Sequence, residues 1–126
     1  MYLLDTHAML WYLRDSPELS ASAHSLIDKA EYVAVSIASF WEIAIKQSIG
    51  KMQICMTIPE LEALCLDRYI QVLPVQSVVL EQIKSLPKIH GDPFDRLIIA
   101  QAQISKMTII TRDKMIPQYP VQTFWG

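Results

Sequence analysis

The sequence predicts an α/β fold: a three-layer α/β/α sandwich with a mainly parallel central sheet. Short apolar runs rich in β-branched residues alternate along the chain with longer stretches of helical periodicity. Strands that alternate with helices imply right-handed crossovers and a parallel sheet that is covered on both faces. With 126 residues, 52% of them hydrophobic, the chain is expected to form a single domain over residues 1–126 with a dense core.

Two strand–helix alternations are expected in the first half of the chain. The expected elements are strands over residues 1–5 and 32–36 and helices over residues 8–13, 20–30 and 39–49. Thr6 is expected to cap the first helix and Ser39 to begin the third, because hydroxyl oxygens accept hydrogen bonds from first-turn N–H groups. Gly50 is the expected C-cap of the third helix, since glycine adopts the left-handed conformation without strain.

The second half contains the unit around which the other elements are arranged, residues 91–113. Asp92 followed by Pro93 predicts a helix start, because aspartate caps a helix and proline needs no N–H donor at the first helical position. The helix is expected to end near Ser105 and to return the chain to a strand. The other expected elements are helices over residues 59–68 and 77–86, strands over 70–74 and 107–111, one turn at most over 115–119, and an edge strand over 121–125.

Four carboxylates are predicted to meet at one edge of the sheet. Asp5 and Asp113 close predicted strands, and Glu42 and Asp95 lie in the first turns of predicted helices. Ligands of open α/β sheets bind at the carboxyl ends of the strands. Clustered carboxylates repel one another unless a cation neutralises them, and oxygen ligands without cysteine or histidine favour Mg²⁺ or Mn²⁺. The sequence therefore predicts a divalent metal site that is suited to phosphodiester hydrolysis.

Some of these acids also have a simpler structural explanation. Ser39 and Glu42 have the spacing of a capping box, and Glu42 can pair with Lys46 one turn later. Asp95 can stabilise the positive end of a helix dipole beside Asp92, which is itself either an N-cap or a fifth ligand. Only the two acids that close strands have no obvious capping role.

Four segments, DTHAMLWYL, SFWEIAIK, DPFDRLIIAQA and TIITRD, occur in this order and resemble the motifs of the PIN-domain ribonuclease family, specifically the VapC-type toxins of toxin–antitoxin pairs. The likeness spans nearly the whole chain. It implies a PIN-like fold and, at the matching positions, metal binding and catalysis by Asp5, Glu42, Asp95 and Asp113. It also implies an endoribonuclease that depends on Mg²⁺ or Mn²⁺, acts as a type II toxin on RNA, forms a homodimer and is inhibited by a cognate antitoxin.

Five further residues are candidates for supporting roles, either in substrate binding or in holding a ligand or a water: Asp92, Thr111, His7, Arg96 and Arg112. Thr111 resembles the small hydroxyl residue of the family's closing motif. Lys46 and Arg14 are additional candidates for phosphate contact. Trp11 and Trp41 lie in apolar runs and are expected to pack in the core rather than stack on bases.

The net charge of −2 is unusual for a nucleic-acid-binding protein. RNA binding must therefore depend on local basic side chains, on bound metal, or on a surface formed by oligomerisation. No apolar run reaches the roughly 18 residues that a membrane span needs, and the N-terminus lacks a basic segment followed by an apolar one. A cytoplasmic protein that does not insert into membranes is expected.

Two alternative functions fit the same predicted fold. A catalytically silent PIN-like binding module would keep the architecture without holding metal, and the four acids argue against it. A Mg²⁺-dependent phosphotransfer or phosphatase domain also gathers acids at strand ends. The segment Asp5-Thr6-His7, however, lacks the second aspartate that a dehalogenase-like motif needs, and the chain has no adjacent pair of acids typical of a receiver domain.

Overall fold

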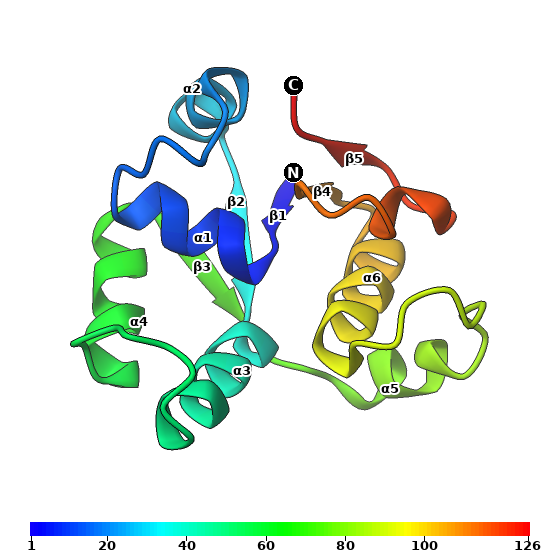
Figure 1. Cartoon of the computed structure of the whole chain (residues 1–126). Coiled ribbons are helices and arrows are strands. Elements are labelled where there is room, and N and C mark those ends of the chain that lie inside the picture. Colours follow the sequence, from blue (N-terminus) through cyan, green and yellow to red (C-terminus); the bar gives the residue numbers. More distant parts are fainter.

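The computed structural model describes residues 1–126 and contains a five-stranded sheet whose strands are all parallel. The strands are β1 (Tyr2–Leu4), β2 (Val33–Ser36), β3 (Ile70–Leu73), β4 (Thr108–Ile110) and β5 (Thr123–Phe124), in the order β3-β2-β1-β4-β5. The helices are α1 (Thr6–Leu13), α2 (Ala21–Lys29), α3 (Ile37–Ser48), α4 (Ile58–Asp67), α5 (Ser77–Ile83), α6 (Pro93–Ser105) and the short 3₁₀ helix η1 (Ile116–Gln118). The predicted α/β/α architecture is confirmed (Figure 1).

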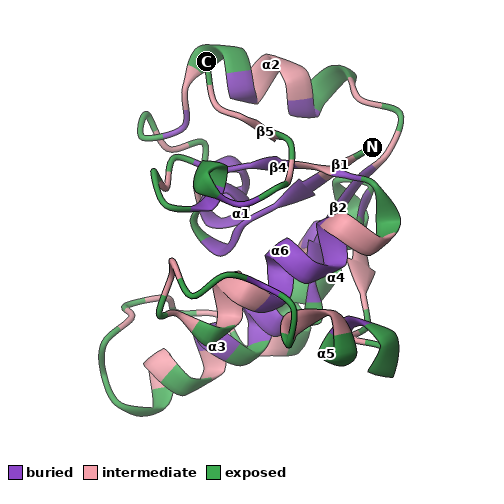
Figure 2. Cartoon of the chain, turned by 90° about the vertical axis from the view of Figure 1, so that its right-hand side faces the viewer, coloured by how far each residue is buried: buried purple, intermediate pink, exposed green.

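The sheet separates two hydrophobic clusters. Leu4 and Val35 pack with residues of α1, α2 and α4, whereas their strand neighbours Leu3 and Ala34 pack with residues of α5 and α6. This alternation follows from strand geometry, because successive side chains point to opposite faces of the sheet. Both faces of the sheet are therefore covered, and Figure 2 shows the central strands β1, β2 and β4 and helix α6 largely buried, with the outer turns of the other helices exposed.

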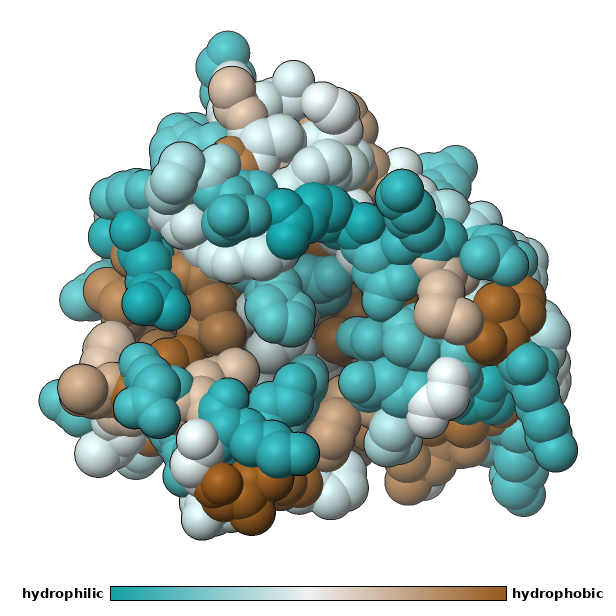
Figure 3. All heavy atoms as spheres, viewed as in Figure 1, coloured by the Kyte–Doolittle hydropathy of each residue, from teal (hydrophilic) through white to brown (hydrophobic).

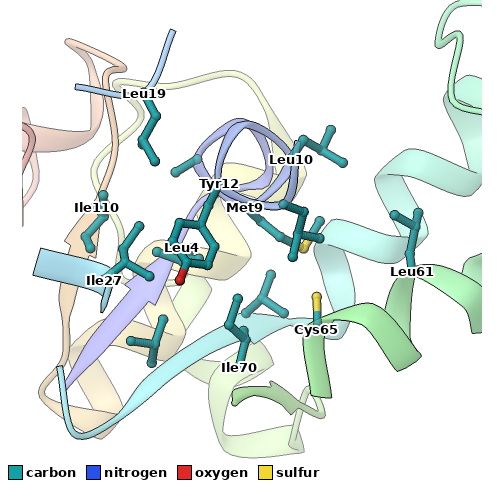
Figure 4. Packing of buried hydrophobic residues seen from close by; sticks show 14 of the residues in the cluster. Leu4, Met9, Leu10, Tyr12, Leu19, Ile27, Leu61, Cys65, Ile70 and Ile110 are labelled. Carbon is teal, nitrogen blue, oxygen red and sulfur yellow. The ribbon is translucent and has the colours of Figure 1, made fainter. Parts of the chain in front are cut away.

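The first cluster shows how several helices converge on one face of the sheet. Met9 of α1, Ile27 of α2 and Cys65 of α4 surround Leu4 and Ile70 of the strands (Figure 4). These side chains are almost completely buried. The packing fixes α1 over the sheet, and α1 in turn begins at the edge where the predicted site lies.

The order of the strands reverses between β1 and β4. β2 and β3 extend the sheet on one side of β1, while β4 and β5 extend it on the other. In open parallel sheets, the crevice outside the carboxyl ends of the strands at such a reversal is where ligands bind. Asp5 follows β1 and Thr111 follows β4, so the crevice lies between residues that the sequence assigns to the site.

Two helix starts differ from the prediction for the same physical reason. Asp5, not Thr6, is the N-cap of α1, and Ser36, not Ser39, is the N-cap of α3. Each strand leads into its helix without an intervening loop, so the residue at the junction accepts the first-turn N–H bond, at 2.8 Å in α1 and 3.0 Å in α3. The predicted capping box of Ser39 and Glu42 is therefore wrong, and Glu42 lies in the second turn of α3.

The remaining elements have the predicted type and order, and several of them are shorter than predicted. Gly50 directly follows the C-cap of α3 with a φ of +70°, and Asp92 caps α6 as expected. The last strand is confined to two residues, because only this part of the segment pairs with β4 at the edge of the sheet. None of the helices combines the length and the apolar character that crossing a membrane requires.

Candidate active site

A polar pocket lies at the carboxyl edge of the sheet, beside the first turns of α1 and α6 and the middle of α3. Asp5, Glu42, Asp95 and Asp113 all line it. The other lining residues are Thr6, His7, Trp11, Lys46, His90, Asp92 and Arg112. Figure 3 shows a hollow with hydrophilic surroundings near the middle of the face on which α1, α3 and α6 meet. The structure thus brings the four predicted acids into one site, and their role as metal ligands remains a prediction.

Asp5 is buried at the floor of the pocket, with 7% of its surface exposed. Its Oδ1 accepts the Ala8 N–H at 2.8 Å, and its Oδ2 accepts the Thr111 hydroxyl at 2.6 Å. The Thr111 hydroxyl also accepts the Asp113 N–H at 3.0 Å, so Thr111 links the acids that follow β1 and β4. Burial raises the pKa of Asp5 in spite of these hydrogen bonds, because desolvation disfavours the charged form.

Glu42 is held by contacts from two helices. Its Oε1 accepts the Thr6 hydroxyl at 2.7 Å, and its Oε2 lies 2.7 Å from the Nζ of Lys46, one turn along α3. Ser39 Oγ lies 2.9 Å from Thr6 Oγ1, so the serine expected to cap α3 instead supports the residue that binds Glu42. The hydrogen bond to Glu42 raises the pKa of Lys46, which keeps its ammonium charged in the pocket.

Asp92 and Asp95 occupy different roles at the start of α6. Asp92 Oδ1 accepts the Phe94 and Asp95 N–H groups at 2.8 and 3.1 Å, which makes Asp92 the N-cap. Asp95 points into the pocket from the first turn. Burial, followed by the negative charges of Asp92 and Asp5, raises the pKa of Asp95 from 3.8 to about 7. Burial and the neighbouring charges thus disfavour the ionised form of Asp95, and a bound cation would favour it.

The carboxylate of Asp113, which follows β4, has hydrogen-bond partners at both of its oxygens. Its Oδ1 accepts the Met115 N–H at 2.7 Å, and its Oδ2 lies 2.8 Å from the Nε2 of His90. Burial alone would raise the pKa of Asp113, but these hydrogen bonds outweigh it and hold the pKa below its ordinary value. The same Nε2 lies 3.0 Å from Asp95 Oδ2, so His90 bridges two of the predicted ligands.

His90 is the site residue that the sequence analysis missed. The ring Nδ1 of His90 accepts the Asp92 backbone N–H at 3.2 Å, and the backbone N–H of His90 donates to the Tyr119 hydroxyl at 2.6 Å. In the neutral ring Nδ1 accepts the Asp92 N–H, so Nε2 carries the proton and donates it toward Asp113 and Asp95. A signal was present in the sequence, since His90 lies two residues before the capping Asp92 in the short loop that leads into α6.

The remaining candidates separate into those at the pocket and those away from it. His7 is exposed on the pocket wall, and Arg112 lies over the Trp11 ring, 4.4 Å from its centroid. Arg96 is directed away, with its guanidinium donating to the carbonyl of Pro87 at 3.0 Å, so the expected contact of Arg96 with substrate in this pocket is not supported. Arg14 does not line the pocket either.

Two tryptophans differ from their expected place in the core. Trp11 packs against the first hydrophobic cluster but is only partly buried and also lines the pocket. Trp41 is 58% exposed on α3, with its ring in an edge contact with Phe94 at a centroid distance of 5.1 Å. A continuous apolar run passes around the whole helix, so it does not show which of its residues lie on the buried side and which on the exposed side.

The residues of the pocket fit a divalent cation. His90, Asp95 and Asp113 offer potential ligand atoms that all lie within 4.8 Å of one another. With the Nε2 of His90 protonated, the carboxylates are the donors, and hard oxygen donors without a thiolate suit Mg²⁺ or Mn²⁺. Burial is the main cause of the raised pKa values of Asp5 and Asp95, and neighbouring carboxylates add to it, so a bound cation would favour their ionised forms. Asp5 and Glu42 border the same space with oxygens already oriented by Thr111 and Thr6.

Comparison with solved structures supports the same fold. The chain is similar to VapBC2 from Rickettsia felis bound to a DNA fragment from their promoter, with a TM-score of 0.70 at 15% identity, covering 99% of this chain and 98% of that one. It is also similar to a toxin–antitoxin complex from Klebsiella pneumoniae, with a TM-score of 0.59 at 16% identity, covering 90% and 87% of the two chains. At these identities the likeness establishes the arrangement of elements.

Comparison of sequences establishes the family. The chain is 30% identical over 116 residues to Ribonuclease VapC22 from Mycobacterium tuberculosis, an alignment that covers 90% of this chain and 88% of the relative. The sequence model of the PIN domain matches residues 2–122, a span that includes every acid of the pocket. The chain therefore belongs to the PIN-domain family.

Proposed function

We propose that this protein is an endoribonuclease that depends on Mg²⁺ or Mn²⁺ and acts as the toxin of a type II toxin–antitoxin pair. The observation that carries the proposal is the convergence of Asp5, Glu42, Asp95 and Asp113 in one pocket where the strand order reverses. Membership of the PIN-domain family and the 30% sequence identity with a ribonuclease support RNA cleavage as the reaction. The toxin–antitoxin complexes among its structural neighbours support an antitoxin partner.

The four acids would hold the ion, and the neighbouring side chains would orient them. When bound, a divalent ion supplies positive charge that stabilises the phosphate in the transition state and lowers the pKa of water. Lys46 presents an ammonium on the pocket wall, beside Glu42, where it can neutralise a non-bridging phosphate oxygen. Thr6 and Thr111 fix the orientation of Glu42 and Asp5, so these carboxylates need not reorganise during the reaction.

The proposal extends to a homodimer, for which α3 offers an apolar surface. Ile37, Trp41, Ile45 and Ile49 are exposed on successive turns of α3, and Figure 3 shows hydrophobic residues gathered over this helix at the lower edge of the molecule. A second copy would cover the same stripe by twofold symmetry. Ile45→Glu is expected to convert a dimer into a monomer in size-exclusion chromatography with light scattering; a monomeric wild type would contradict the homodimer.

Cleavage of RNA by purified protein tests the enzymatic part of the proposal. RNA is expected to be cut in the presence of Mg²⁺ or Mn²⁺ and to stay intact in EDTA. Asp95→Asn and Asp113→Asn should each lower the rate by about a hundredfold or more, because each removes a charge beside the reacting phosphate. Glu81→Gln, which changes an exposed acid on α5, is the matched control and should cleave like the wild type. Equal cleavage by all of these variants would rule out the proposed site.

Expression in cells tests the toxin role separately. The protein is expected to arrest growth and degrade RNA when it is expressed alone in the cytoplasm, and to do neither when its antitoxin is co-expressed. The Asp95→Asn variant should be harmless in both conditions. Active enzyme that leaves growth unaffected would retain the nuclease assignment and remove the toxin role.

A further inference from the structure

One wall of the pocket consists of three planar side chains, His7, Trp11 and Arg112, which we call the planar wall. Trp11 is the one apolar residue that lines this otherwise polar pocket. The His7 and Trp11 ring centroids lie 5.4 Å apart, and the Arg112 guanidinium carbon lies 4.4 Å from the Trp11 centroid. The acids of the proposed active site occupy the rest of the same pocket.

Contacts with Trp125 and Glu18 hold two members of the planar wall in place. Trp11 meets Trp125 of the C-terminal segment edge to face, with centroids 5.9 Å apart. Arg112 Nη1 donates to Glu18 Oε2 at 2.7 Å, which orients the guanidinium over Trp11. The fixed parts are therefore Trp11 and the plane of Arg112, whereas His7 is exposed and the Arg112 side chain is 51% exposed. Both outer members line the same pocket as the acids.

We propose that the planar wall binds a nucleobase of single-stranded RNA next to the phosphate that is cleaved. Bases stack on aromatic rings and on guanidinium planes, and such stacking is available only to bases that are not already stacked in a duplex. The N–H groups of Arg112 that Glu18 does not occupy can reach the adjoining phosphate. The inference rests on the proposed ribonuclease function and adds to it a subsite for the base beside the cleaved phosphate.

A base-specific binding experiment tests the planar wall without requiring catalysis. Fluorescence anisotropy in EDTA compares a labelled single-stranded oligoadenylate with an abasic oligonucleotide of the same length. Because the two probes carry the same phosphates, the ratio of their dissociation constants isolates the contribution of the bases. The wild type is expected to bind the oligoadenylate about tenfold more tightly than the abasic probe. His7→Ala and Arg112→Gln alter exposed side chains and are expected to reduce this ratio to about twofold or less.

Arg68→Gln provides the matched control. Arg68 also lies over an aromatic ring, 5.9 Å from the centroid of Tyr12, but it does not line the active-site pocket. This variant should keep the wild-type ratio. Equal affinity of the wild type for the two probes, or an unchanged ratio in both His7→Ala and Arg112→Gln, would overturn the inference. Cleavage of long RNA by the same wild-type preparation tells whether the proposed function stands when the planar wall fails.

Discussion

Asp5 combines two roles that normally belong to different residues. Its carboxylate caps α1, and it also forms the buried floor of an acidic pocket. Losing a cap destabilises a protein, whereas losing a buried charge that has a raised pKa stabilises it. Asparagine separates these effects, because it caps a helix about as well as aspartate does and carries no charge.

Asp5→Asn is therefore expected to raise the melting temperature of the metal-free protein, by about 4 °C if the gain is near 1 kcal/mol. Asp5→Ala should lower it, because the N-cap is lost as well. Excess Mn²⁺ should stabilise the wild type more than Asp5→Asn, since an ion that binds only the folded state adds to its stability. Thermal melts in EDTA and in Mn²⁺ measure both effects. A lower melting temperature for Asp5→Asn in EDTA, with no shift by metal in either protein, would contradict a shared ion site.

His90 acts through the acids that it touches. With Nδ1 accepting a backbone N–H, its Nε2–H is directed at Asp113 and Asp95 and fixes the rotation of their carboxylates. Such supporting hydrogen bonds typically change metal affinity by about 10- to 100-fold. We therefore treat His90 as a positioning residue, whose effect should appear in metal binding as well as in catalysis.

His90→Ala is expected to weaken Mn²⁺ binding by about tenfold or more, as measured by isothermal titration calorimetry. His90→Gln should recover part of the loss, because its amide N–H can donate to the same carboxylates. His24→Ala is the matched control, since His24 lies beside Asp28 and Asp15 outside the pocket. Unchanged Mn²⁺ affinity in a folded His90→Ala protein would leave His90 with only a structural role.

The type and order of the elements were predictable from the sequence, but the start of a helix was less so. Periodicity distinguishes a buried strand such as β2 from an amphipathic helix such as α2. It cannot show whether a loop separates two elements. No loop separates strand and helix at Asp5 or at Ser36, so these residues are the N-caps in place of the predicted Thr6 and Ser39. Helix α4 begins one residue earlier than predicted, because Thr57 and Glu60 form a capping box there with both reciprocal hydrogen bonds.

Lys106 offers a test of how α6 ends. It is the C-cap of α6, exposed, and has the left-handed conformation, with φ 56° and ψ 47°. Glycine adopts this conformation without the strain of a Cβ, so Lys106→Gly is expected to raise the free energy of unfolding by about 0.5 to 1 kcal/mol. Lys29→Gly, at the last helical position of α2, should lower it by a similar amount. Urea denaturation of both variants measures this difference, and a change of the same sign in both would contradict the argument.

At the scale of the whole molecule, topology made the four acids predictable, but not His90 or the contact of Arg112 with Trp11. Parallel strands bring Asp5 and Asp113 to one edge whatever the details of packing. The position of His90 depends instead on the path of the loop between α5 and α6, and the position of Arg112 over Trp11 depends on the segment after β4, which periodicity does not report. The outward direction of Arg96 likewise follows from its contacts with the α5–α6 loop, not from its place in the DPFDR segment.

The acidic pocket should also make the stability of the metal-free protein depend on pH. The pKa of Asp95 rises from 3.8 in the unfolded chain to about 7 in the fold, so its contribution is fully present below pH 3.8 and is lost as pH rises through about 7. Burial alone would lower the pKa of His90, but its hydrogen bond to Asp113 and the charge of Asp95 outweigh burial and raise it. Its contribution is therefore present below about 6.5 and is also lost as pH rises.

Asp5, whose pKa is raised mainly by burial, acts in the same direction as Asp95 and His90. Asp113, whose lowered pKa opposes them, matters only in more acidic solution. The metal-free protein is expected to melt at least about 5 °C lower at pH 8 than at pH 5.5. Asp95→Asn removes one of these groups and should make the dependence less steep. Mn²⁺ at pH 8 should restore the lost stability in the wild type, because the ion supplies the positive charge that protons supply at lower pH. Melting temperatures measured in EDTA across this range decide the matter: a wild type that is more stable at pH 8 would show that the carboxylates do not repel one another.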